Sequence, residues 1–252
     1  MIACCVRQTN IVWIAMFFLL PFFEGHRHEP ENTISLISIR QHVATYWPYP
    51  LILSLFMAFV YLNNGISVGM QEYMHIKIQL NNVFFFLIVF FAIYLPNIIN
   101  ELIDTPSGLK NRNVLLIIGI SFIIYCFSFN ELHSWNIRNI FYLLRNLPLQ
   151  LITHSIMFKM AMFIPIALSI FSLTLNASKC SKLYVLLSVS FFYLLTMFLV
   201  EPRYYICIVA FYALFRSYKE RKHELIQTVY LFAISWALFF YNLSFESVLQ
   251  QF

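Results

Sequence analysis

The sequence predicts an all-α fold of about seven to eight transmembrane helices, from its composition, its charge and its long apolar runs. The chain has 252 residues, of which 61% are hydrophobic and only 11% are charged. A soluble domain carries about 25% charged residues, so this chain lacks the polar side chains to cover a water-facing surface. Its formal net charge of +5 lies mostly in short loops, which is typical of membrane topology. We therefore predict one transmembrane domain over residues 1–252, with the lipid bilayer as a partner and no nucleic acid.

Apolar runs near the length that crosses a bilayer as a helix, about 20 residues, recur along the whole chain. The runs that predict spans are Asn10–Phe23, Tyr46–Leu62, Val83–Ile99, Val114–Phe129, Leu149–Leu175, Tyr184–Val200 and Glu224–Asn242. An eighth apolar run, Tyr204–Phe215, is short and fits a half-span or a re-entrant segment. The first run lacks a small-residue cleavage site, so we interpret it as a span rather than a signal peptide.

Basic residues divide unevenly between the two sides of the membrane when all eight runs are counted as crossings. One side receives ten: Arg27, Arg40, Lys110, Arg112, Lys179, Lys182, Arg216, Lys219, Arg221 and Lys222. The other side receives five: Arg7, Lys77, Arg138, Arg145 and Arg203. The positive-inside rule then places the first group in the cytoplasm, and Arg203 and both termini on the opposite side.

The segment between the runs Tyr184–Val200 and Tyr204–Phe215 holds an acid, a proline and a cation: Glu201, Pro202 and Arg203. Charges beside hydrocarbon are expensive, so they usually face a protein interior or a water-filled cavity. Pro202 has no N–H to donate and therefore marks a break between helices. Two interpretations stay open. Either the pair belongs to a functional polar site at the membrane boundary, or the two charges only neutralise each other.

Three other segments combine polar residues with a predicted membrane boundary. The first is Arg7-Gln8-Thr9-Asn10, which opens the first span and is either an interfacial anchor or a polar cluster facing a substrate cavity. His75 and His133 lie in loops between spans, where a histidine is either simply solvated or acts as an acid, a base or a hydrogen-bond donor.

Motifs for metals and nucleotide cofactors are missing from the sequence. His26-Arg27-His28 has no third ligand at metal-binding spacing, so we interpret it as a solvated loop. No phosphate-cradling glycine loop or dinucleotide fingerprint occurs in the sequence. We expect neither a metal nor a cofactor.

Four segments, in this order, resemble one family: the endoplasmic-reticulum α-1,2-glucosyltransferases that add the terminal glucose to the dolichol-linked oligosaccharide. The RQTNI-W segment of that family resembles Arg7–Trp13. Its glycine-containing loop ending in H-x-P-Q is similar to Asn64–Gly69 with His75 and Gln79. Asn130–Arg145 resembles a degraded version of the family's D-N-R-H-Y-T-F-Y-I-W-R stretch. Leu199–Arg216 resembles the family's L-x-E-x-R-Y-F-I-L-P-Y segment.

The resemblance implies the C-terminal portion of a GT-C-like membrane glycosyltransferase in the endoplasmic-reticulum membrane. Its donor would be dolichyl-phosphate glucose and its acceptor the diglucosylated dolichol-linked oligosaccharide. The residues implied to bind substrate are Arg203, Glu201, Tyr204, His75, His133, Arg7, Gln8 and Asn10.

No catalytic base is assigned, because the family's acidic first lumenal loop has no counterpart in this sequence. The aspartate of its D-N-R-H stretch is also replaced. Whether the chain is an enzyme therefore stays open at this point. The alternative is a non-catalytic membrane subunit or lipid-binding scaffold derived from the family.

Overall fold

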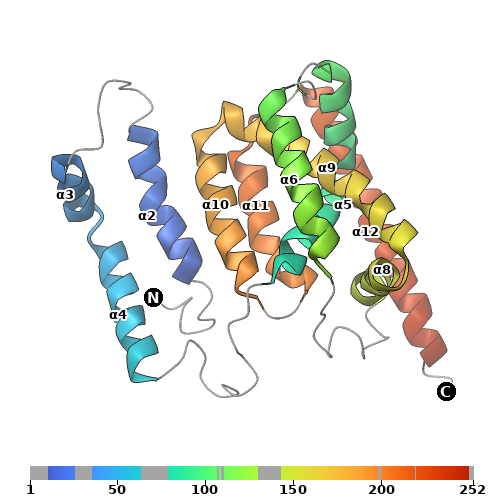
Figure 1. Cartoon of the computed structure of the whole chain (residues 1–252), viewed down its shortest axis with the longest axis horizontal. Helices are drawn as coiled ribbons and strands as arrows, with labels where there is room; N and C mark the ends of the chain where they lie inside the picture. Colours follow the sequence, from blue (N-terminus) through green and yellow to red (C-terminus); the bar gives the residue numbers. More distant parts are fainter. Residues whose placement is uncertain are drawn as a thin grey trace.

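The computed structural model describes residues 11–25, 36–63, 79–106, 108, 111–129, 143–197, 200–218 and 220–249. Within these residues every regular element is a helix, which confirms the predicted all-α class (Figure 1). The helices are α2 (Ile11–Gly25), α3 (Leu36–Thr45), α4 (Pro48–Leu62), α5 (Leu80–Asp104), α6 (Arg112–Phe127), α8 (Leu143–His154), α9 (Ile156–Lys179), α10 (Ser181–Leu195), the 3₁₀ helix η4 (Pro202–Tyr204), α11 (Ile206–Phe215) and α12 (Arg221–Leu249).

Three described helices are individually long and apolar enough to cross a membrane: α5, α9 and the Arg221–Tyr241 part of α12. The pair α3 and α4, bent by 85° at its break, adds a fourth if it counts as one span. The helices α2, α6, α10 and α11 are shorter and apolar. With a rise of about 1.5 Å per residue, α11 covers roughly half of the ~30 Å hydrocarbon layer, as its short apolar run predicts. The total of seven to eight spans remains a prediction.

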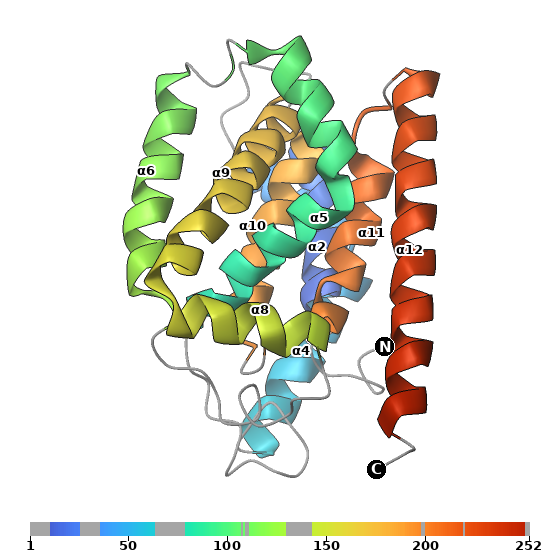
Figure 2. The same cartoon turned by 90° about the vertical axis from the view of Figure 1, so that its right-hand side faces the viewer.

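The predicted span Leu149–Leu175 is wrong as a continuous helix. Ser155 interrupts it with an extended backbone (φ −126°, ψ 113°), and its side chain accepts a hydrogen bond from the backbone N–H of Phe158. This N-cap ends α8 and starts α9, although the apolar run continues across it. In Figure 2, α8 lies across one end of the bundle while α9 runs along it.

The bundle is organised around α5, which packs against α9, α10 and α12, while α2 packs against α10 and α4. Its interior is filled mainly by large aromatic side chains; among those less than 2% exposed are Phe85, Phe90, Tyr125, Phe171 and Tyr205. A chain with 28 phenylalanines and five glycines packs by filling space between helices rather than by close backbone approach.

Contacts between helix ends define two ends of the bundle. The backbone N–H of Gln79, before α5, donates to the carbonyl of Leu195 at 3.0 Å. At the opposite end of α5, the side chain of Asn176 donates to Glu101 at 2.9 Å. We name these the Arg203 end and the Arg216 end, after the arginine that follows α10 and the one that follows α11. The predicted topology puts the Arg216 end in the cytoplasm, and this sidedness stays a prediction.

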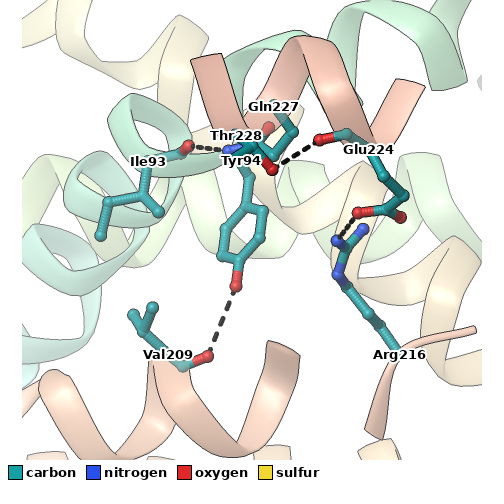
Figure 3. A network of polar contacts seen from close by, with 7 residues as sticks. All are labelled: Ile93, Tyr94, Val209, Arg216, Glu224, Gln227 and Thr228. Carbon is teal, nitrogen blue, oxygen red and sulfur yellow. Dashed lines mark hydrogen bonds and ion pairs between the residues drawn. The ribbon is translucent and has the colours of Figure 1, made fainter. Parts of the chain in front are cut away.

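At the Arg216 end, α12 is fastened to a kink in α5 (Figure 3). The kink has non-helical torsions at Tyr94 (φ −105°, ψ 18°), two residues before Pro96. Because Pro96 has no N–H, the carbonyl of Ala92 loses its helical partner, and the hydroxyl of Tyr230 donates to it at 2.7 Å. The side-chain amide of Gln227 donates to the next carbonyl, Ile93, also at 2.7 Å. Side chains of α12 thus satisfy backbone groups that would otherwise face hydrocarbon.

Candidate functional site

The break between α10 and α11 presents a cation at the Arg203 end. Glu201 and Arg203 form an ion pair across η4, as the sequence analysis considered. The two side chains differ in exposure: 13% for Glu201 and 59% for Arg203. The carboxylate therefore faces protein while much of the guanidinium stays open to a ligand. Charge neutralisation does occur, but it does not bury the cation.

The ring of Tyr204 packs against the same guanidinium. Its ring centroid lies 5.7 Å from the guanidinium carbon of Arg203, and the tyrosine is only 4% exposed. Partial burial lowers the pKa of Arg203, but the charges and hydrogen bonds of Glu201 and Tyr204 outweigh it, so this pKa lies above its ordinary value. Arg203 is therefore a permanent cation at physiological pH, held by one carboxylate and one aromatic face.

The first turn of α5 holds both flanks of the break. The side-chain N–H of Asn82 donates to the carbonyl of Met197 at 2.7 Å, before Glu201. The hydroxyl of Tyr205, after Arg203, donates to the side-chain oxygen of Asn82 over a long 3.4 Å. Asn82 is completely buried. One amide thus bridges the chain on either side of the ion pair.

The end of α6 reaches the same place. Phe129 has a left-handed backbone (φ 63°), which costs a non-glycine residue about 1–2 kcal/mol. Its N–H donates to the side-chain oxygen of Asn81 at 2.8 Å. The ammonium of Lys159 donates to the carbonyls of Cys126 and Ser128, both at 2.8 Å. These bonds satisfy the last polar groups of α6 and offset the strain.

The start of α2 also lies at this end. The ring of Trp13 packs against Tyr193 with centroids 5.2 Å apart, and Tyr193 lies 6.5 Å from Tyr204 edge to face. Trp13 is the last residue of the Arg7–Trp13 segment. An aromatic chain therefore links this segment to the break.

Of the predicted substrate-binding residues, the structure brings Glu201, Arg203 and Tyr204 together. The other five, Arg7, Gln8, Asn10, His75 and His133, lie outside the described residues and remain predictions. Three described residues that lie in or directly beside the segments of these five, Trp13, Gln79 and Phe129, are at the Arg203 end.

Four residues that build this end were not predicted from the sequence: Asn81, Asn82, Lys159 and Tyr205. Two adjacent amides at the border of an apolar run were a weak signal, since they read equally as the edge of a loop. Lys159 was a stronger one, because a cation inside a predicted span needs a partner. Its partners are carbonyls of α6, which no local pattern reveals.

The arrangement suits the binding of an anionic group. A guanidinium presents parallel N–H donors to two phosphate oxygens, whereas a paired carboxylate such as Glu201 serves to orient it. Within the described part of the chain, no three His, Cys, Asp or Glu side chains gather closely enough to hold a metal ion.

These features define a helical membrane protein that presents an anchored cation where helices break at one end. The chain belongs to the DIE2/ALG10 family, whose model matches residues 1–216, so the resemblance drawn from the sequence is confirmed. Membership supports a glucosyltransferase-like role in the assembly of the N-glycan precursor. No curated protein and no solved structure matches the chain. The family match ends before α12 begins at Arg221.

Proposed function

We propose that this protein takes part in transferring glucose from dolichyl-phosphate glucose to the diglucosylated dolichol-linked oligosaccharide, forming an α-1,2 linkage. The reaction would take place at the endoplasmic-reticulum membrane. One observation supports this most: a described residue in or directly beside each family-like segment, namely Trp13, Gln79, Phe129 and Arg203, lies at the Arg203 end, where the guanidinium is anchored and partly exposed.

The chemistry of such a transfer gives Arg203 a role. The bond between the glucose carbon and the dolichyl phosphate breaks, and a bond to the acceptor hydroxyl forms. The leaving phosphate gains negative charge, which a preorganised cation stabilises more strongly in the transition state than in the ground state. The hydroxyl proton passes to a base that we do not assign among the described residues. Glu201 and Tyr204 hold the guanidinium in place.

We also propose that residues 1–252 act as a single transmembrane domain of the GT-C-like kind. Two features support this. Helix α2 packs on α10. Side chains of α12 donate hydrogen bonds to backbone carbonyls of α5 and so fasten the two helices together. Neither end of the described chain stands apart from the bundle.

Reconstitution of the purified chain into liposomes with dolichyl-phosphate glucose and the diglucosylated acceptor lipid tests the proposal. Radiolabelled glucose in the acceptor fraction is the expected result. Omission of the acceptor and substitution of the monoglucosylated lipid are the controls for specificity. Binding of the donor without transfer would overturn the enzymatic role and favour the non-catalytic scaffold.

A further inference from the structure

We infer that Asn81 and Asn82, adjacent residues in the first turn of α5, are positioning residues that set the Glu201–Arg203 break against the end of α6. The inference rests on the proposed function, because it gives these residues a role at the donor-binding site. Neither asparagine touches the ion pair through a hydrogen bond described above. They act through the backbone that carries it.

Asn82 holds the break from both sides with one side chain. Its N–H bonds the carbonyl of Met197, four residues before Glu201, and its oxygen accepts from Tyr205, two residues after Arg203. An amide donates and accepts at once, which a carboxylate or an aliphatic side chain of similar size does not do. Asn82 is fully buried, so no water replaces a lost bond.

Asn81 reaches a different neighbour. Successive residues of an α-helix point about 100° apart, so two adjacent amides address two separate partners. The oxygen of Asn81 accepts from the N–H of Phe129, and Asn81 is 7% exposed. Phe129 is the residue directly before the predicted Asn130–Arg145 segment, which contains His133.

The two asparagines therefore make one turn of α5 the shared anchor of two chain segments distant in sequence. Met197 and Phe129 are 68 residues apart along the chain. If either bond is lost, the break that carries Arg203 and the end of α6 at Phe129 are no longer held together by the same turn of α5. Misplacement by about 1 Å lowers the rate of a positioned reaction by as much as 10²-fold.

The test compares full-length variants in lipid nanodiscs, with dolichyl phosphate as the probe. Asn82→Leu removes both hydrogen bonds to the break. Tyr205→Phe removes only the one that the Tyr205 hydroxyl donates, and this milder variant serves as the test if Asn82→Leu does not fold. Ser169→Ala is the matched control, since Ser169 is also fully buried and donates to a backbone carbonyl, that of Leu87, at 2.8 Å. Ser169 makes this bond in the middle of α9, away from the break.

Asn82→Leu is expected to weaken dolichyl phosphate binding about tenfold or more, with Tyr205→Phe changed in the same direction and less. Ser169→Ala should lower the thermal stability about as much as Asn82→Leu does, and it should leave the Kd for dolichyl phosphate unchanged. A Kd for Asn82→Leu no different from that of Ser169→Ala would overturn the positioning role.

Amide hydrogen exchange at Phe129 provides a readout that does not depend on substrate. Asn81→Ala should speed this exchange, and Asn81→Asp, which keeps an acceptor oxygen, should restore protection. If the wild-type chain does not bind dolichyl phosphate, the proposed function fails, and the exchange result then decides alone. Unchanged exchange in Asn81→Ala would refute the link between α5 and α6.

Discussion

The two ends of the bundle each carry an arginine–glutamate pair beside a helix joint, and the pairs differ in what they leave open. At the Arg203 end the guanidinium is 59% exposed and its carboxylate 13%. At the Arg216 end Arg216 is 13% exposed and Glu224 is 18% exposed, so both partners are largely covered. Figure 3 shows the second pair beside the Gln227–Ile93 bond, one of those that fasten α12 to α5. Chemically alike pairs thus differ in how much of the cation they leave exposed.

The difference provides a criterion for proposing a binding site in a chain with few charges. A covered pair joins helices, and removing one of its partners is expected to lower the free energy of unfolding. A pair with one open cation keeps interaction capacity for a ligand, and its worth is measured in binding. The presence of an arginine and a glutamate near the membrane does not distinguish the cases, whereas the exposure of the cation does.

The largest effect is expected from Arg203→Ala, which removes the open cation. Glucose transfer in liposomes should fall about 100-fold in kcat/KM, since loss of one preorganised charge-stabilising group costs roughly that much. Arg221→Ala is the control, because Arg221 is exposed and lies at the start of α12, at the other end. Equal losses in the two variants would contradict the placement of the site.

The next effect is expected at the covered pair and in a different quantity. Glu224→Gln leaves the largely covered Arg216 without its carboxylate, which should lower the free energy of unfolding by about 2 kcal/mol. Thermal unfolding in detergent measures this change. Transfer per folded molecule should stay near the wild-type value, and a selective loss of donor affinity with unchanged stability would reverse the roles of the two ends.

A smaller effect is expected from Arg203→Lys, which keeps the charge and loses the planar fork. A single ammonium does not reproduce two parallel hydrogen bonds to phosphate, so kcat/KM should fall about tenfold. Kinetics with dolichyl-phosphate glucose check this. Full activity would show that charge alone, without bidentate geometry, accounts for the role of Arg203.

The smallest effect is expected from Tyr230→Phe, which removes one hydroxyl from α12. The carbonyl of Ala92 would lose its donor at the Pro96 kink, and side-chain hydrogen bonds between membrane helices contribute about 0.6 kcal/mol on average. A slight drop in the unfolding temperature with unchanged transfer is the expected outcome. Val229→Ala, on an exposed position of the same helix, is the control.

The sequence predicted those parts of the molecule that depend on composition or on one local signal. The helical class followed from the apolar runs. The break followed from Pro202 between two charges beside hydrocarbon, and the same signal drew attention to Glu201 and Arg203, whose role in binding stays a prediction. The shortness of α11 could also be read directly from its run.

What the sequence did not predict depends on partners far along the chain. Asn82 gains its meaning from Met197, 115 residues away, and Asn81 from Phe129, 48 residues away. The split at Ser155 lies inside an unbroken apolar run, where a backbone cap outweighs hydropathy. An additional helix, α3, docks on α2, with the His42 ring nitrogen 2.8 Å from the carbonyl oxygen of Phe18. Such pairings are set by tertiary packing.

The central claim is that the dolichyl phosphate group binds at the Arg203 end. Photo-crosslinking of the full chain in nanodiscs with a photoreactive dolichyl phosphate, followed by peptide mapping, tests it most directly. Label is expected on the peptide that spans residues 196–205, where unlabelled dolichyl phosphate should compete with it and Arg203→Ala should abolish it. Competed label on the 216–224 joint, retained in Arg203→Ala, would contradict it.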